Sequence, residues 1–128
     1  MLFRSSQIVG EYGMLDYFWT LDNAQNKDFV AAFEKKYGKK PNSNNANSYT
    51  VTDVALRALQ ATNGDASYEK LRDVMLKLRW DSVSGPAYFS SNGFAVTSRH
   101  VVQVVKDGNL YIWKPIQEFK GIKDPRDQ

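Results

Sequence analysis

Residues 23–42 read NAQNKDFVAAFEKKYGKKPN, and this stretch predicts one amphipathic helix with a marked start and a marked end. Asp22 or Asn23 can accept a hydrogen bond from a backbone N–H of the first turn and so cap the helix. Gly38 can close it in the left-handed conformation, and Pro41 prevents it from resuming. The apolar side chains recur at the spacing of one helix face: Phe29, Val30, Phe33 and Tyr37.

The pattern on either side predicts a strand before this helix and two more helices after it. Tyr12–Thr20 is aromatic and apolar, which favours a buried strand. The second helix, over about residues 46–62, is apolar nearly all round, as is typical of a helix buried on more than one side. A third helix is predicted over residues 67–79, capped by Ser67. We expect Phe33, on the apolar face of the first helix, to be buried in the core.

The character of the chain changes from helix to strand after the Gly85–Pro86 pair. Ala87–Phe89 is a short strand candidate, and His100–Val105 is rich in β-branched residues. Asp107–Gly108 is a strong hairpin signal, and Leu110–Trp113 is its partner strand. The sequence therefore predicts an α/β chain with three helices followed by a β-hairpin.

The composition is that of an ordinary soluble globular protein, with 42% hydrophobic and 24% charged residues in 128. A net charge of +3 is mild, and the basic residues lack the aromatic interleaving that single-strand nucleic-acid binders use. We therefore expect no nucleic-acid partner. The opening MLFRSSQIVG is too short and too polar for a signal peptide. Cysteine is absent, which excludes disulfides.

The residues that carry enzyme chemistry are sparse. His100 is the single histidine, whereas zinc normally needs three or four nitrogen or sulfur donors. We expect it on a strand surface. A cysteine nucleophile, a GxSxG elbow and a glycine-rich phosphate loop are all missing. The sequence therefore predicts no catalytic residue, no metal and no cofactor.

Aromatic and amide side chains are a better candidate for function. Phe18 and Trp19 end the predicted strand, and Asn44 and Tyr49 lie at the start of the second helix. Small-molecule sites combine aromatic walls with a few orienting polar groups. The same residues also fit core packing and an ordinary polar loop, so composition leaves both interpretations open.

Short segments of the sequence follow one another in a particular order, which includes YGMLDY at 12–17, LDNxxNKxFVxxF at 21–33, KxYGxxP at 35–41, YxxxxxA at 49–55, EKLRD at 69–73, DxxxGPxxF at 81–89 and VVQVVKDG at 101–108. This order resembles the C-terminal third of type I periplasmic solute-binding proteins of ABC transporters. The group that it resembles most takes branched-chain amino acids, and its relatives take aromatic acids and amides.

The resemblance implies a fragment of a fold with two α/β lobes, joined by crossover strands and clamping a ligand between them. Residues 1–128 would then be a single partial domain. Residues 11–86 would belong to the first lobe, with Tyr17–Leu21 as one crossover. Residues 87–128 would carry the hairpin and tail of the second lobe, after a last crossover at Gly85–Phe89. The first helix would be scaffold that covers a parallel sheet.

The resemblance also implies a function. The chain would be part of the solute-binding component of an uptake system for a small amino acid-like or aromatic acid solute, with a membrane permease as partner. The full-length parent would be periplasmic or extracellular, and not an enzyme. Residues of the family near Asn44 and Tyr49 often contact the ligand, and Phe18 and Trp19 are a second possibility. The fragment alone is expected to self-associate. Two alternatives stay open: a ligand-sensing receptor domain of the same fold, and a small self-contained α+β interaction protein.

Overall fold

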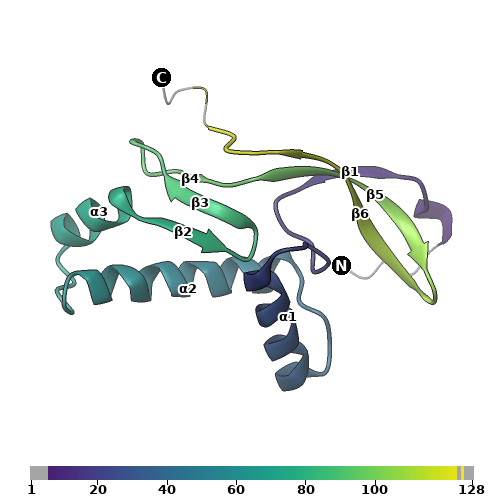
Figure 1. The fold of residues 1–128 in the computed structure, drawn as a ribbon, viewed down its shortest axis with the longest axis horizontal. Coiled ribbons are helices and arrows are strands. Elements are labelled where there is room, and N and C mark those ends of the chain that lie inside the picture. The colour runs from purple at the N-terminus through teal and green to yellow at the C-terminus, as the bar shows by residue number, and fades with distance from the viewer. Residues whose placement is uncertain (1–5, 124, 126–128) are drawn as a thin grey trace.

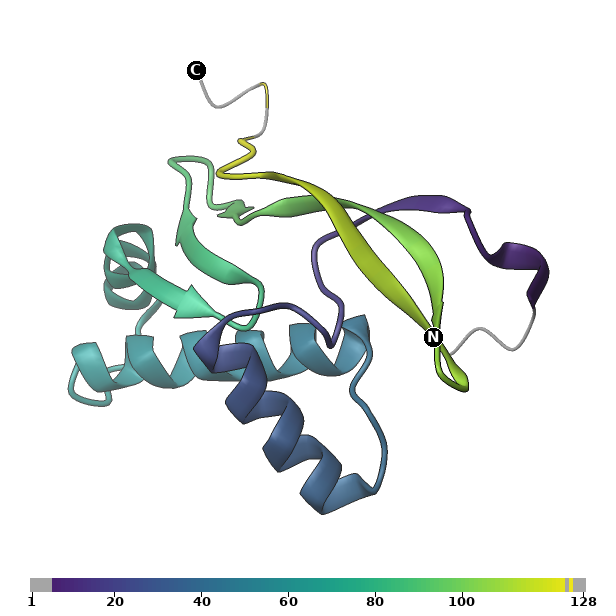
Figure 2. The same ribbon diagram turned by 45° about the vertical axis from the view of Figure 1, so that its right-hand side comes forward.

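The computed structural model describes residues 6–123 and 125. Figures 1 and 2 show helices packed beside a short sheet at one end of the molecule and a long twisted hairpin at the other. The elements in chain order are η1 Ser6–Ile8, β1 Tyr12–Leu15, α1 Ala24–Tyr37, α2 Ser43–Ala61, α3 Tyr68–Lys77, β2 Arg79–Ser82, β3 Gly85–Phe89, β4 Ala95–Val96, β5 Arg99–Asp107 and β6 Leu110–Phe119.

The helices begin and end at residues with capping chemistry. Asn23 accepts a hydrogen bond from the backbone N–H of Asn26 at the start of α1, and Gly38 closes this helix with φ of 67°. α2 begins at Ser43, before the expected residue 46, because Asn42 and Asn45 form a reciprocal capping box. The three predicted helices are confirmed, with α3 ending at Lys77 instead of residue 79.

The hairpin sheet consists of β1, β5 and β6, in the order β1-β5-β6 and antiparallel throughout. Its turn is Gly108 and Asn109, one residue later than predicted, because Asp107 pairs with Leu110. β6 runs to Phe119, well beyond the predicted end at Trp113. Pro115 lies inside β6, next to a register shift, and an edge strand tolerates a residue without an N–H.

The short sheet consists of β2, β3 and β4, also antiparallel. The sequence pattern did not predict β2, which takes up the residues expected at the end of the third helix and just after it. Its burial alternates, with Trp80 and Ser82 facing inward. Gly85, the first residue of β3, has φ of 101°, a conformation that is strained for residues with a side chain.

Two predictions about strands are wrong. The strand predicted over Tyr12–Thr20 extends only to Leu15, and Tyr12 is 66% exposed because β1 is an edge of the hairpin sheet. The residues that follow it, 17–21, are irregular: Tyr17, Phe18 and Leu21 are buried, and the Leu21 N–H donates to the Phe18 carbonyl in a turn. His100 is in a strand as predicted, but it is buried against the ring of Phe18 instead of lying on the surface.

Strand pairing groups the elements differently from the division expected at residue 86. β1 joins the hairpin sheet, although it precedes all three helices. β3 pairs with β2 on one side and with β4 on the other, next to α2 and α3. The chain therefore crosses between the two parts twice: at residues 16–23 between β1 and α1, and at residues 97–98 between β4 and β5.

Two clusters of buried side chains hold these parts together. The larger one joins the irregular segment after β1 to α1, α2 and β5, and comprises Tyr17, Phe18, Leu21, Phe29, Val30, Ala46, Val83 and Val102. The smaller one, Val54, Trp80 and Ala87, packs α2 against the short sheet. Phe33 is only half-buried, contrary to our expectation, because Phe29 occupies the core position one turn earlier.

One face of the helical part is left uncovered among the described residues. A groove of about 500 Å³ lies between α2, α3 and the short sheet. We call it the helical groove; its lining includes Val51, Val54, Ala55, Leu59, Leu71, Met75 and Phe89. Val51 is 69% exposed. The apolar surface of α2, which extends nearly all round the helix, is thus only partly buried within the described part of the chain.

Phe29 and Phe33 provide a direct test of the core. We predict that Phe29→Ala lowers the free energy of unfolding by about 3–5 kcal/mol, because it empties a fully buried site. Phe33→Ala should cost about 1–2 kcal/mol, because its ring keeps contact with water. Urea unfolding of both variants measures this difference, and equal losses would mean that Phe33 is as buried as Phe29.

Candidate functional site

The irregular segment after β1 is held in place from α1. Asn26 is 1% exposed, and its Nδ2 donates to the carbonyl oxygens of Trp19 and Leu21 at 3.0 and 2.9 Å. The cap formed by Asn23 fixes the turn of α1 that carries Asn26. Both amide hydrogens of one buried side chain therefore satisfy two carbonyls that no strand pairs.

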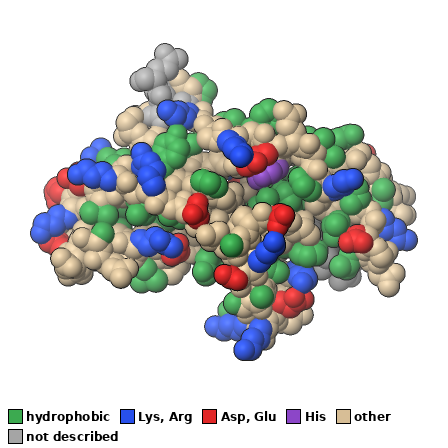
Figure 3. Space-filling view, viewed as in Figure 1, with side chains coloured by type: hydrophobic (Ala, Val, Ile, Leu, Met, Phe, Trp, Pro, Cys, Tyr) green, Lys and Arg blue, Asp and Glu red, His purple; other side chains and the backbone are tan. Residues whose placement is uncertain are grey.

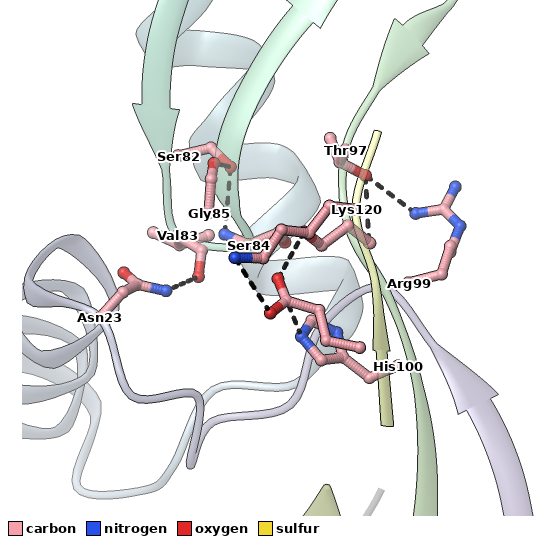
Figure 4. A network of polar contacts seen from close by, with 11 residues as sticks. Asn23, Ser82, Val83, Ser84, Gly85, Thr97, Arg99, His100 and Lys120 are labelled. Carbon is pink, nitrogen blue, oxygen red and sulfur yellow. Dashed lines mark hydrogen bonds and ion pairs between the residues drawn. The ribbon is translucent and has the colours of Figure 1, made fainter. Parts of the chain in front are cut away.

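The segment is also tied to both sheets. Thr20 Oγ1 donates to the carbonyl oxygen of Trp113 in β6 at 3.2 Å. Asn23 Nδ2 donates to the carbonyl oxygen of Val83, in the turn between β2 and β3, at 3.1 Å (Figure 4). The segment is thus the place where the helical part meets the hairpin sheet.

A small crevice opens at this meeting point. We call it the aromatic crevice; it is lined by residues 17–20, 41–43 and 111–113. Its volume is about 30 Å³, which admits one or two non-hydrogen atoms and not a whole solute. Trp19, Tyr111 and Trp113 are half-buried in it. The crevice therefore resembles one wall of a larger site.

The rings of the crevice are positioned by the backbone around them. Gly13 of β1 lies under Trp113, where an added Cβ would come within 3.4 Å of the indole ring. A Cβ at this position would be in ordinary van der Waals contact with the ring, so Gly13 and Trp113 are packing neighbours. Trp113 of β6 thus reaches across β5 to contact β1.

The electrostatic character of the crevice is mildly positive. Lys40 Nζ lies 5.0 Å from the centre of the Trp19 ring and 2.6 Å from Glu34 Oε2. α2 begins at Ser43, so the positive end of its dipole is also here. None of the lining residues that the structure describes is Asp or Glu. Burial raises the pKa of the Tyr17 hydroxyl far above its usual value, so this group stays neutral.

The structure does not bring the four predicted contact residues together. Phe18 and Trp19 both line the crevice, but Phe18 is only 3% exposed and its ring centre lies 5.3 Å from that of His100. Asn44 is exposed in the first turn of α2. Tyr49 is 50% exposed in a separate groove between α1 and α2, with its ring 4.7 Å from Phe29.

Sequence reasoning missed Lys40, Tyr111 and Trp113 as site residues. Lys40 belongs to a group of lysines around the end of the first helix, where the helix dipole alone favours cations, and LYIW at 110–113 fits strand pairing. The alternation that places Tyr111 and Trp113 on the same face of β6 was a usable signal. What the sequence could not show is that this face meets Trp19.

A polar network lies beside the second crossing of the chain (Figure 4). Ser98 Oγ donates to Glu118 Oε1 at 2.7 Å, and His100 Nε2 lies 3.9 Å from the same oxygen. Because Ser98 gives its proton to Glu118, the imidazole does not activate it as a nucleophile. The network therefore joins β5 to β6 and does not form a catalytic set.

Other kinds of site find little support in the described part of the chain. It contains no group of three or more His, Asp or Glu residues that could hold a metal ion. Basic and acidic side chains are interspersed over the face shown in Figure 3, and the basic ones do not gather into one continuous patch. None of the helices described is long and apolar enough to cross a membrane.

Comparison with known families identifies this architecture. A family model described as periplasmic binding protein matches residues 6–109. The chain belongs to the periplasmic binding protein family. Members of this family bind solutes and are not enzymes. A comparison with curated proteins gave no match.

Solved periplasmic binding proteins share the fold. A solute-binding protein from Rhodopseudomonas palustris BisB5, in complex with 3,4-dihydroxybenzoic acid, superimposes with a TM-score of 0.90 at 25% identity, over 97% of this chain and 34% of that one. A solute-binding protein from R. palustris in complex with benzoate superimposes with a TM-score of 0.80 at 22% identity, over 94% of this chain and 33% of that one. A leucine-binding protein from Thermotoga maritima superimposes with a TM-score of 0.71 at 26% identity, over 96% of this chain and 33% of that one.

These matches confirm the predicted α/β, type I periplasmic-binding-protein fold. The chain spans about a third of the length of the solved relatives. The parallel sheet that α1 was expected to cover is not among the described strands, all of which pair antiparallel.

Asn26 allows the support of Trp19 to be tested. We predict that Asn26→Ala destabilises the chain by about 1–3 kcal/mol, because the Trp19 carbonyl loses the donor from Asn26 and the Leu21 carbonyl keeps only the backbone N–H of Asn23. The indole N–H signal of Trp19 should broaden or move in the NMR spectrum as its backbone loosens. Gln25→Ala, at an exposed neighbouring position, is the control and should change stability by less than about 0.5 kcal/mol. Similar losses for both variants would refute the assigned role of Asn26.

Proposed function

We propose that this chain is part of the solute-binding component of an ABC-type uptake system that takes a small aromatic acid or amino acid-like solute. The aromatic crevice carries the proposal, because it lies where the helical part meets the hairpin sheet. Further support comes from the family and from relatives solved with benzoates. Trp19 is the predicted residue that we propose to contact the solute, with Phe18 supporting it from the core.

We propose that binding works by closure of two lobes. The helices and the short sheet would belong to one lobe, and the hairpin sheet, with β1, to the other. The two crossings, at residues 16–23 and 97–98, would then act as hinges that change φ and ψ while each part stays rigid. Asn44 and Tyr49 lie outside the crevice, so they would reach a solute only from the rim of the closed site.

We propose a membrane permease as the macromolecular partner and the periplasm or cell exterior as the location of the complete protein. Closure changes the shape presented by the two lobes together, which gives a permease a way to recognise the loaded form. The family assignment favours this function over a self-contained α+β interaction protein.

The affinity of the chain alone follows from how little of the clamp it contains. The chain offers a solute one ring face and a few hydrogen bonds, each of which contributes about 0.5–1.5 kcal/mol to the binding free energy. Their sum barely exceeds the free-energy cost of association, which is at least about 4 kcal/mol. We predict a Kd for benzoates or leucine no tighter than about 1 mM. Calorimetry on the 128-residue chain measures it, and micromolar affinity would show that the site is complete within this chain.

A chimera tests the function itself. The chain replaces the matched third of the R. palustris protein solved with 3,4-dihydroxybenzoic acid. We predict binding at about micromolar Kd, weakened about tenfold or more by Trp19→Ala and less by Tyr49→Ala. A folded chimera that binds equally well with Trp19→Ala would refute the proposed role of the crevice.

The helical groove gives a further expectation. We propose that the remainder of the lobe covers it in the complete protein, and that a second copy covers it when the chain is alone, since monomers rarely leave such apolar surface open. Sedimentation velocity should show a concentration-dependent dimer. Val51→Glu, in the groove, should shift it to monomer, whereas the control Gln60→Glu, which lies outside the groove, should not. A monomeric parent chain would contradict the expectation.

A further inference from the structure

His100, the single histidine of the sequence, lies where the two crossings of the chain meet. It is the second residue of β5, directly after the crossing at residues 97–98, and it is 6% exposed. Its ring lies edge to face against that of Phe18, in the crossing at residues 16–23, with ring centres 5.3 Å apart and ring planes at 89°. This contact therefore joins the first crossing to the strand that continues from the second one.

The surroundings of the two ring nitrogens suit an uncharged imidazole. Nδ1 is buried and has no hydrogen-bond partner among the described residues. Nε2 lies 3.9 Å from Glu118 Oε1, which already accepts from Ser98 Oγ at 2.7 Å. A hydrogen on Nε2 can point toward Glu118, whereas a hydrogen on Nδ1 finds no acceptor, and a buried donor without an acceptor is costly. The packing against Phe18 therefore fits a ring that carries one hydrogen, on Nε2.

The charged groups on the neighbouring elements give the ring one partly exposed partner. Glu118 of β6 is 40% exposed and is shared with Lys120, whose Nζ lies 3.9 Å from Glu118 Oε2 (Figure 4). In the first crossing, Asp16 pairs with Arg99 of β5 at 3.7 Å, and the sequence of β1 contains no charged residue. Water screens the attraction between Glu118 and a charged imidazole, so this pair alone does not hold a protonated ring in place.

We propose that proton uptake by His100 changes the angle between the helical part and the hairpin sheet. Histidine is the side chain that ordinarily changes its charge between pH 5 and 8. When Nδ1 takes up a proton, the ring moves off Phe18 so that the new N–H reaches water, and the first crossing loses its contact with β5. Mild acid therefore frees the two crossings, and neutral pH holds them together. The inference goes beyond solute binding, but it rests on the lobe closure that we propose above.

Residual dipolar couplings measured by NMR on the 128-residue chain report the orientation of its two parts. The couplings of α1 and α2 and those of β5 and β6 are compared at about pH 8 and about pH 5.5, while the imidazole signals of His100 follow its protonation. Exposed Asp and Glu side chains keep their charge over this range. We expect one common alignment for both parts at about pH 8 and two different alignments at about pH 5.5. The midpoint of this change should match that of the His100 signals.

Three variants assign the response to the ring contact. His100→Phe keeps a ring against Phe18 but cannot take up a proton, so it should keep one common alignment at both pH values. Phe18→Leu removes the ring contact without changing a charge, and it should give two alignments already at about pH 8. Asp16→Asn is the matched control, because it removes a charge from the same crossing that pairs with Arg99 and not with His100, and it should keep the full pH response.

The unmodified chain alone can overturn the inference. A common alignment that persists while His100 takes up its proton would do so, as would the absence of proton uptake between about pH 8 and about pH 5.5. A pH response that remains in His100→Phe would assign it to another group. The chimera tests the solute-binding function separately: binding by the chimera together with an alignment that ignores pH refutes the role of His100 and leaves that function standing.

Discussion

The two hydrogen bonds from the buried amide of Asn26 to the carbonyls of Trp19 and Leu21 are the constraint on which the rest of the arrangement depends. They allow the chain to leave the β conformation inside the core without leaving buried carbonyl groups that lack a hydrogen bond. Once this segment is irregular, the ring of Phe18 can face β5 while Trp19 faces the crevice. The position of the candidate site is therefore a consequence of one side chain on the first helix.

What the sequence predicted well was determined locally. The caps of α1 and the hairpin signal near residue 107 depend on neighbours within a few residues, and so they could be predicted from the sequence. β2 was missed because its pairing with β3 is visible only once the turn at residues 82–85 forms. The end of β6 was missed because its residues beyond Trp113 are exposed and include a proline, and only the pairing with β5 makes them a strand.

The contrast between local signals and tertiary packing also explains which residues of the candidate site could be predicted. Trp19 could be proposed from its type and its place after a strand. Lys40 and Trp113 could not, since each had a sufficient local explanation and their proximity to Trp19 depends on tertiary packing. Phe33 shows the converse, because helical spacing cannot decide which of two aromatic residues on one face points to the core and which to the rim.

Pro115 in β6 has a consequence for behaviour at high concentration. β6 is one edge of the hairpin sheet, and its proline leaves a gap in the row of donors that an approaching strand would need. The other edge, β1, is only four residues long. Strand-by-strand polymerisation into fibrils is thus discouraged at both edges of the sheet, which suits a chain that exposes apolar helical surface.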